Sequence, residues 1–384
     1  MKALDDVRVL DFGQYLAGPF GPMILADLGA DVVKVEPVSG DGMRPAGKAF
    51  FGCQRSKRSI ALDLKSPPGL DVALELVQTA DVVHHNMTLG TDTKLGIDYE
   101  SCRRVRPDII YAANYAYGVD GPLAHFGGLD PLFQASSGLE YEAGATHEGN
   151  DPLYYRFGMC DTGNAMLSVV GVLTALHHRD RTGRGQKLWT SLLDAGALFS
   201  SDVFVSGGGG SNRPRVDGGL HGLSAGYRLY ETADEWIQVA AVDDESMCAL
   251  RRAAGVASDD ELEAALRTRT SAAWKESLDE AQVACEVPYD AHGGTRSLRD
   301  PTNVELGLVT SYEHPTMGEV RQFGSLLEFS QTSDNEAAPP PLVGQHTREI
   351  LDELGIERSD QEALRDAGVV AWPDDDYAQR YGPW

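Results

Sequence analysis

Asp161 is the residue of this sequence whose type and position most invite chemistry, because it stands directly ahead of a long apolar run. Gly163 and Asn164 follow it, and the chain from Ala165 to Leu176 is then apolar on almost every side, as in a buried helix. The basic residues and glycines of 181–185 suit the end of that helix. We therefore expect an ionised carboxylate at the N-terminal end of a core helix, where the helix dipole stabilises negative charge.

This position allows two roles for Asp161. Aspartate is among the preferred N-cap residues, so a plain structural cap is the first interpretation. Carboxylates in unusual surroundings also occur at catalytic sites, although most of them are structural. The residues around Asp161 are compatible with both roles.

A second set of candidates follows the strands that the pattern of the chain predicts. Buried strands are expected at 7–12, 31–35, 59–64, 82–84 and 108–113. Helices are expected between them, at 19–28, 67–79 and 99–105. This alternation predicts an α/β fold with a parallel sheet at least five strands wide. Ligands of such sheets bind beyond the carboxyl ends of the strands, which here carry Gln14 to Ala17, Lys65, Asn86, Met87 and Asn114.

Basic residues near these strand ends could meet phosphate groups, although ordinary surface exposure explains any one of them equally well. They are Arg44, Arg55, Lys57, Arg58, Lys65 and Lys94.

The first β-α-β unit does not carry the dinucleotide-binding fingerprint. Glu36 follows the second strand, where such a fold has its ribose-binding acid. The glycines of the first loop, however, are Gly13, Gly18 and Gly21, which do not form G-x-G-x-x-G. Binding of NAD is therefore not expected.

Two further motifs fail on their surroundings. The segment 222–226 matches the G-x-S-x-G elbow of serine hydrolases, but that elbow needs a helix after the serine, and a strand is expected at 227–230. The pairs His84-His85 and His177-His178 are adjacent residues, whose side chains point in different directions. No metal site is expected from them.

Composition narrows the class of protein. The formal charge of −25 over 384 residues argues against a nucleic-acid partner, which needs a basic face. Five widely spaced cysteines without C-x-x-C argue against a disulfide framework. The N-terminus has no signal-peptide pattern, and the longest apolar stretch falls short of a membrane span. We expect a cytoplasmic protein without a membrane partner.

The second half of the chain predicts a smaller α+β region and then a return to the first domain. Gly207 to Gly210 is the clearest linker, and a second glycine loop occupies 217–222. A hairpin is expected at 227–241, helices at 245–254, 259–267 and 271–284, strands at 309–312 and 318–323, and a last helix at 348–354. The expected domains are a large one from 1–205 and 308–384, and a small one from 206–307.

Taken in order, several segments of the chain resemble the class III CoA-transferase family, which includes formyl-CoA transferase, carnitine CoA-transferase and the α-methylacyl-CoA racemases. They are VLDFGQYLAGPFGPMILADLGADVVKVEP, KRSIALDLKSPPG with ADVV, GVDGP, the Asp161 helix ending in HHRDRTGRGQ, YETADEWIQVAA and PPPLVGQHTREILDELG. Each segment alone is weak, whereas the ordered set is highly specific. With this resemblance the catalytic interpretation of Asp161 overtakes the capping one.

The resemblance implies a covalent mechanism with Asp161 as the nucleophile. The carboxylate would attack an acyl-CoA thioester to give an aspartyl anhydride and CoA thiolate, and the thiolate would return to give an aspartyl-CoA thioester. An acceptor acid is then activated through a second anhydride. Both intermediates hydrolyse, so water must be excluded. Gly218 and Gly219 occupy the position of the family's active-site loop, and Gly207 to Gly210 is the rival.

The resemblance also assigns residues to the CoA site and to the substrate pocket. The CoA contacts would be Gln14, Ala17, Leu62, Lys65, Asn86, Met87 and Lys94. Lys94 replaces a frequent arginine, Met87 replaces a common aromatic residue, and the surroundings of Asn86 are altered. Leu16 stands where formyl-CoA transferase has a glutamine associated with oxalate, so a less polar acyl group is expected.

Two alternatives to a CoA-transferase stay open. A racemase-like isomerase needs a histidine at the position of Leu129, before Asp130, and leucine cannot move a proton; His125 lies four residues upstream. A CoA-binding homologue without turnover is the other alternative, suggested by the altered surroundings of Asn86. The family fold implies a Rossmann-like large domain that binds CoA, a small inserted domain, and two ring-shaped subunits that interlock as a homodimer.

Overall fold

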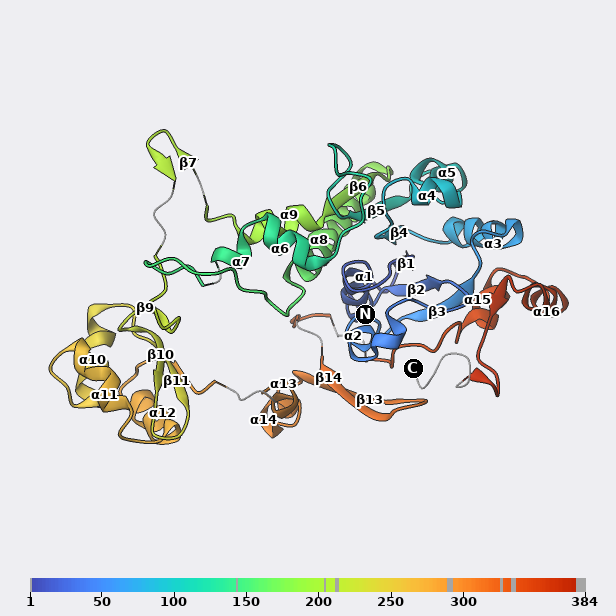
Figure 1. The fold of residues 1–384 in the computed structure, drawn as a ribbon. Helices are drawn as coiled ribbons and strands as arrows, with labels where there is room; N and C mark the ends of the chain where they lie inside the picture. The colour runs from blue at the N-terminus through green and yellow to red at the C-terminus, as the bar shows by residue number, and fades with distance from the viewer. Residues whose placement is uncertain are drawn as a thin grey trace. The chain divides into compact units, whose positions relative to one another are not determined.

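The protein is described here by a computed structural model that covers residues 2–142, 144–203, 205–210, 214–288, 293–324, 327–332 and 336–377. It divides into two compact units (Figure 1). The first comprises 1–137, 155–201 and 301–384, and the second comprises 138–154 and 202–300. The sequence places the domain boundaries at 205 and 307 and assigns 138–154 to the large domain, whereas the structure groups that segment with the second unit.

A seven-stranded sheet with the order β15-β3-β2-β1-β4-β5-β6 forms the centre of the first unit. Its strands are β1 (Arg8–Asp11), β2 (Asp31–Glu36), β3 (Arg58–Leu62), β4 (Val82–His85), β5 (Ile110–Tyr115), β6 (Lys187–Ser191) and β15 (Val370–Ala371). All neighbours are parallel except β15, which runs antiparallel to β3. The predicted α/β class and mainly parallel sheet are confirmed.

Helices cover both faces of this sheet, as a parallel sheet requires. On one face, side chains of α3 (Pro67–Gln78), α5 (Tyr99–Val105) and α15 (Thr347–Glu353) form a core with alternate strand residues such as Leu10. On the other face, α1 (Phe20–Asp27) and α8 (Met159–Thr182) form a second core with residues such as Val9. In Figure 1, α15 lies beside β3 near the edge of the sheet.

Helix α8 is longer than the sequence predicts. The sequence predicts the helix from the apolar run that starts at Ala165, but the helix begins at Met159 and has 24 residues. By length and composition it could cross a membrane, which corrects the expectation that the apolar stretch is too short; half of its most apolar stretch is buried inside the protein. Its contacts with α1, β5 and β6 are those of a core helix.

The remaining elements of the first unit are short. They are η1 (Arg44–Ala46), α2 (Lys48–Phe51), α4 (Thr91–Leu95), α6 (Asp130–Ser136), α9 (Leu192–Phe199), α14 (Pro301–Glu305), β13 (Val309–His314), β14 (Gly318–Phe323) and α16 (Arg358–Asp366). Helices α4 and α16 and strand β15 have no counterpart in the sequence prediction. Strands β13 and β14 form a separate antiparallel pair.

The second unit is built on an antiparallel sheet of order β12-β11-β10-β9. Its elements are α7 (Leu139–Glu142), β7 (Val205–Ser206), β8 (Gly209–Gly210), β9 (Gly222–Ser224), β10 (Tyr227–Glu231), β11 (Trp236–Ala240), α10 (Asp244–Ala254), η2 (Asp259–Glu261), α11 (Leu262–Leu266), α12 (Ser271–Glu280), β12 (Cys285–Glu286) and α13 (Gly293–Ser297). The predicted hairpin is confirmed as β10 and β11.

Two glycine-rich segments of this unit have definite structures. Gly207 to Gly210 is not a plain linker, because β7 and β8 pair with each other and Gly207 and Gly208 form the turn between them. Ser224 ends β9 and is followed by β10, so the G-x-S-x-G segment has no helix after its serine. The predicted strand after the serine is confirmed.

Buried ion pairs gather between the carboxyl ends of β1 and β2 and the beginning of β3. Lys57 pairs with Asp11 at 2.7 Å, Lys34 pairs with Asp41 at 2.7 Å, and all four side chains are fully buried. Glu36 accepts two hydrogen bonds from Arg44 and one from the Ser59 hydroxyl. The Glu36 carboxylate is therefore occupied by contacts within the fold.

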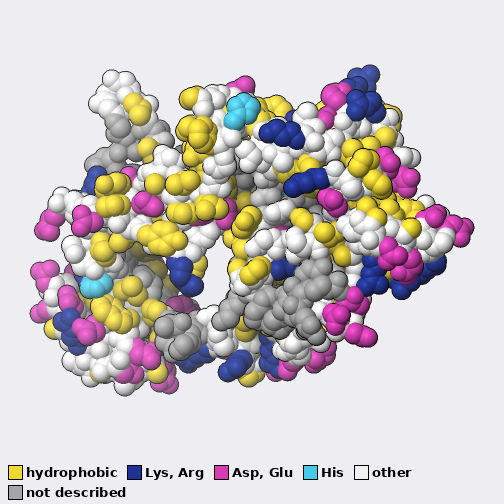
Figure 2. All heavy atoms as spheres, turned by 45° about the vertical axis from the view of Figure 1, so that its right-hand side comes forward, with side chains coloured by type: hydrophobic (Ala, Val, Ile, Leu, Met, Phe, Trp, Pro, Cys, Tyr) yellow, Lys and Arg dark blue, Asp and Glu magenta, His cyan; other side chains and the backbone are white. Residues whose placement is uncertain are grey.

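Most of the basic residues proposed as phosphate ligands are used within the fold. Arg44 and Lys57 belong to the buried pairs described above, Arg55 pairs with Asp27, and Arg58 pairs with Asp31 and Glu353. Lys65 and Lys94 are exposed. On the face drawn in Figure 2, Lys and Arg side chains form small separate groups among acidic and apolar ones.

Lys57→Met should lower the free energy of unfolding by about 3–5 kcal/mol, because Asp11 would keep its buried charge without this partner. Urea denaturation measures the change. Arg358→Met, which breaks an exposed pair with Asp352, is the control and should cost less than about 1 kcal/mol. Equal effects of the two changes would contradict this account of the buried pair.

Candidate active site

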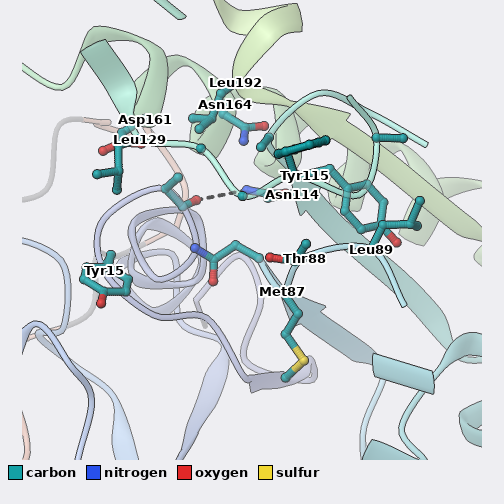
Figure 3. Close-up of a pocket in the computed structure, with 17 residues that line it drawn as sticks. Tyr15, Met87, Thr88, Leu89, Asn114, Tyr115, Leu129, Asp161, Asn164 and Leu192 are labelled. Atoms are coloured by element: carbon teal, nitrogen blue, oxygen red, sulfur yellow. Dashed lines mark hydrogen bonds between the residues drawn. The ribbon is translucent and has the colours of Figure 1, made fainter. Parts of the chain in front are cut away.

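A pocket of about 200 Å³ opens where β1, β4 and β5 end (Figure 3). Its lining residues are Tyr15 and Ala17 after β1, Asn86 to Leu89 after β4, Asn114 to Ala116 around the end of β5, Ala124 and Phe126 to Leu129 ahead of α6, Asp161 and Asn164 of α8, and Leu192. The structure thus brings Asp161 together with several residues expected at the strand ends.

Asparagine side chains hold the loop after β1 in place. The Asn86 amide accepts a hydrogen bond from the Gln14 N–H at 2.9 Å and donates one to the Gln14 carbonyl at 2.8 Å. Asn114 donates to the Ala17 carbonyl at 2.9 Å. A Cβ atom on Gly18 would lie 2.6 Å from the Asn86 amide, so only glycine fits there.

Asp161 lies inside the first turn of α8 and does not cap it. The N-cap position belongs to Gly158, and the acid that bonds to the helix terminus is Asp130 of α6, whose Oδ2 accepts a hydrogen bond from the Asp161 N–H at 2.9 Å. The capping interpretation of Asp161 is therefore wrong. Its own carboxylate remains available on the pocket wall.

The surroundings of Asp161 favour the neutral acid more than the sequence predicts. Burial raises the pKa of Asp161 to about 7, and the negative charge of Asp130 adds to the effect. Asp130 is buried and bonded to Gln134, which also donates to the Phe157 carbonyl at 3.0 Å. The expectation that the helix end stabilises the ionised carboxylate is corrected, because burial and the Asp130 charge raise the pKa of Asp161 instead.

The two residues assigned to the substrate pocket lie close to this carboxylate. Leu129 is exposed and lines the same pocket. A Cβ atom on Gly158 would lie 2.9 Å from Leu16 Cδ2 and 3.4 Å from Asp161 Oδ2, so Leu16 and Asp161 flank that glycine. Glycine at 158 therefore lets both side chains approach each other.

Only some of the residues expected to contact CoA lie at the pocket. Ala17, Asn86 and Met87 line the pocket, and Gln14 adjoins it through its bonds to Asn86. The side chain of Leu62 is buried in the core, so only its main chain could contact a ligand. Lys65 and Lys94 are exposed outside the pocket lining.

The loop with Gly218 and Gly219 belongs to the second unit and is a compact turn. Asp217 Oδ1 accepts hydrogen bonds from the N–H groups of Gly219, at 3.0 Å, and His221, at 2.9 Å. Leu220 has a φ of +59° within this turn. All of these hydrogen bonds lie within the loop itself.

Other candidates contribute little to the site. His125 is exposed and does not line the pocket. His84 is buried and bonded to Ser168, and burial lowers its pKa to about 4. No group of three His, Cys, Asp or Glu side chains suited to a metal occurs among the described ranges.

The sequence alone does not single out Asn164, which lines the pocket, or Asp130, which accepts a hydrogen bond from the Asp161 N–H. Asn164 precedes the apolar run from which the sequence predicts the helix, yet it lines the pocket one helical turn after Asp161. The extent of α8 is the signal that could have found it, since residues three apart on a helix share a face. Asp130 was noted only as the neighbour of Leu129, and its contact with Asp161 depends on the fold.

Comparison with known proteins agrees with this geometry. The model of the CoA-transferase family III matches residues 4–347. The chain belongs to this family. It is 31% identical to the succinyl-CoA:glutarate CoA-transferase of Mus musculus, with 96% of this chain and 91% of that protein covered. It is also 31% identical to the succinyl-CoA:mesaconate CoA-transferase of Haloarcula hispanica, with 93% and 97% covered.

Solved structures agree on the fold of this class III CoA-transferase. A CAIB/BAIF family protein from Brucella suis superposes with a TM-score of 0.78 at 24% identity, covering 92% of this chain and 99% of that one. Rv3272 from Mycobacterium tuberculosis superposes with a TM-score of 0.77 at 26% identity, covering 91% and 99%. The enzyme class and its use of CoA thioesters follow from the family.

Asp130→Asn should shift the pH dependence of kcat/KM. A nucleophilic Asp161 must be ionised, so kcat/KM should rise with pH and level off above about 7 in the wild type. Removing the Asp130 charge lowers the pKa of Asp161, so the rise should occur at lower pH. Initial rates from pH 5 to 9 measure the shift, and Asp120→Asn, an exposed loop change, should leave the profile in place. An unmoved profile in Asp130→Asn would contradict the electrostatic coupling.

Proposed function

We propose that this enzyme moves CoA from an acyl-CoA donor to a carboxylic acid, with the Asp161 carboxylate as the covalent nucleophile. The observation that carries the proposal is a half-buried carboxylate, without a capping role, on the wall of a pocket at the carboxyl ends of the strands. This is where parallel α/β sheets bind their ligands.

In the first step an Asp161 oxygen bonds to the thioester carbon, the C–S bond breaks and CoA leaves as the thiolate. The product is a mixed anhydride between Asp161 and the acyl group. The thiolate then attacks the aspartyl carbonyl carbon, which releases the donor acid as a carboxylate and leaves Asp161 as a CoA thioester. An acceptor carboxylate attacks that thioester, and the returning thiolate takes the acceptor acyl group and frees Asp161.

The pKa of Asp161 and the apolar residues near it support these reaction steps. A carboxylate with a pKa near 7 is available in ionised form at neutral pH and is poorly solvated, which favours attack on a carbonyl carbon. Leu16 and Leu129 give the surroundings an apolar part that limits water, which both intermediates require. We propose that Gly218 and Gly219 cover the site and that Gln14, Ala17, Asn86, Met87, the Leu62 main chain, Lys65 and Lys94 hold CoA.

The relatives suggest which acids to test first. Their names specify succinyl-CoA with glutarate, mesaconate or D-citramalate, and one relative is named for oxalate. Leu16 removes a polar partner for a dianion as small as oxalate. We therefore propose a donor and an acceptor among longer, less polar carboxylic acids. We also propose that two subunits interlock to form a homodimer.

The racemase-like alternative receives no support from the site. Leu129 lines the pocket at the position where a second acid or base would be needed, and His125 lies outside the lining. A homologue that binds CoA without turnover is an outcome that the following experiment distinguishes.

Asp161→Ala should abolish CoA exchange, because no other group on the pocket wall is placed to form the anhydride. The protein is incubated with succinyl-CoA, other acyl-CoAs and a panel of mono- and dicarboxylic acids, and mass spectrometry follows the exchanged thioesters and adducts on the Asp161 peptide. The wild type should show exchange and a CoA adduct, and Asp120→Ala should match it.

Three results would contradict the proposal. Exchange that persists in Asp161→Ala excludes this nucleophile. Deuterium uptake at the α-carbon without exchange indicates an isomerase. Binding of CoA without exchange or uptake indicates a non-catalytic homologue.

A further inference from the structure

We propose that Asn164 is a catalytic residue that binds the carbonyl oxygen of the acyl group attacked by Asp161. The amide nitrogen would donate a hydrogen bond to this oxygen as it gains negative charge. The inference deepens the proposed transfer reaction and rests on it.

The side chain of Asn164 is a buried amide without a partner. Its exposed fraction is 0%, and neither the amide nitrogen nor the amide oxygen has a hydrogen-bond partner among the described residues. Buried polar groups are nearly always bonded, because an unmet donor or acceptor destabilises the fold. A residue that departs from this rule inside a ligand pocket is best explained by a partner that arrives with the substrate.

The position of Asn164 fits the attack geometry. It follows Asp161 by three residues on α8, so the two side chains project from the same helix face. Both line the same pocket, and Figure 3 shows them on its α8 wall. We place the oxygen of a carbonyl group that Asp161 attacks beside the Asn164 amide, which lies on the same pocket wall.

Three main-chain donors at the start of α8 are already occupied. The N–H of Asp161 donates to Asp130, and the N–H of Met159 donates to the Phe157 carbonyl at 2.8 Å. The Thr162 N–H donates to the Gly158 carbonyl at 2.9 Å. These three groups at the start of α8 therefore cannot stabilise an oxyanion without losing a bond, whereas the Asn164 amide can do so without such a loss.

The charge balance of the step explains why a donor is needed. When the Asp161 oxygen bonds to the thioester carbon, the carbonyl π electrons move onto the oxygen, and the nearby Asp130 is already negative. A fixed amide donor stabilises this developing charge more than it stabilises the neutral ground-state carbonyl. Collapse of the adduct expels the thiolate and returns the electrons to the carbonyl.

Asn164→Leu tests the role, because leucine has nearly the same shape and no polar atom. We expect kcat for CoA exchange to fall by about 10²–10³-fold, as for removal of a single oxyanion donor. The KM for acyl-CoA should change little. The melting temperature should stay the same or rise, because an unmet buried amide is replaced by an apolar group.

Asn114→Leu is the matched control for a structural asparagine in the same pocket. It removes the bond to the Ala17 carbonyl, so its melting temperature should fall. Single-turnover mass spectrometry should also show slower formation of the Asp161 adduct in Asn164→Leu, which a purely structural role would not predict in a protein of unchanged stability.

The outcomes separate this inference from the proposed function. Exchange at the wild-type rate in a stable Asn164→Leu protein overturns the role of Asn164 and leaves Asp161 as the nucleophile. A loss of activity that accompanies a fall in melting temperature like that of Asn114→Leu assigns Asn164 to structure and also overturns it. If the wild type exchanges CoA with no acid and forms no Asp161 adduct, the proposed function fails, and this inference fails with it.

Discussion

The buried ion pairs at the ends of β1, β2 and β3 fix the loop from which the active-site pocket is built. Lys57 bonds to Asp11 and also donates to the Pro19 carbonyl, and Lys34 donates to the Gly13 carbonyl. Each ammonium group therefore joins a strand to the loop 13–19. A buried charge destabilises the fold unless all of its hydrogen-bond partners are present. Because the loop supplies some of these partners, it has little freedom to take another conformation.

Hydrogen-bond partners also determine the role of Asp161 in helix α8. Asp130 occupies the N–H of Asp161, and this contact leaves the Asp161 carboxylate on the pocket wall instead of in a cap. Burial raises the pKa of Asp161, with a contribution from Asp130, so the helix terminus does not stabilise the ionised form enough to offset desolvation. A poorly solvated carboxylate that still ionises near neutral pH suits a group that must attack and then be regenerated.

The sequence predicts the parts of this arrangement that depend on local pattern. Strands β1 to β5 follow from runs of apolar residues, and the interest of Asp161 follows from its place before another such run. Contacts between distant segments were not predictable: Arg44 and Lys57 resemble free phosphate ligands until Glu36 and Asp11 are seen beside them. Strand β15 has only two residues and exists because β3 offers it an edge.

Three asparagines around the pocket differ in how many hydrogen bonds their side-chain amides make within the protein. Asn86 uses its amide nitrogen and oxygen to hold Gln14, so a contact with CoA would have to share one of these bonds. Asn114 donates to Ala17, but its oxygen has no partner among the described residues. Asn164, nearest to Asp161 along the chain, has neither bond. The number of unmet hydrogen bonds thus increases from Asn86, beside the loop that the ion pairs hold, to Asn164 on the helix that carries Asp161. This order is expected if Asn86 maintains the pocket and Asn164 binds a molecule that enters it.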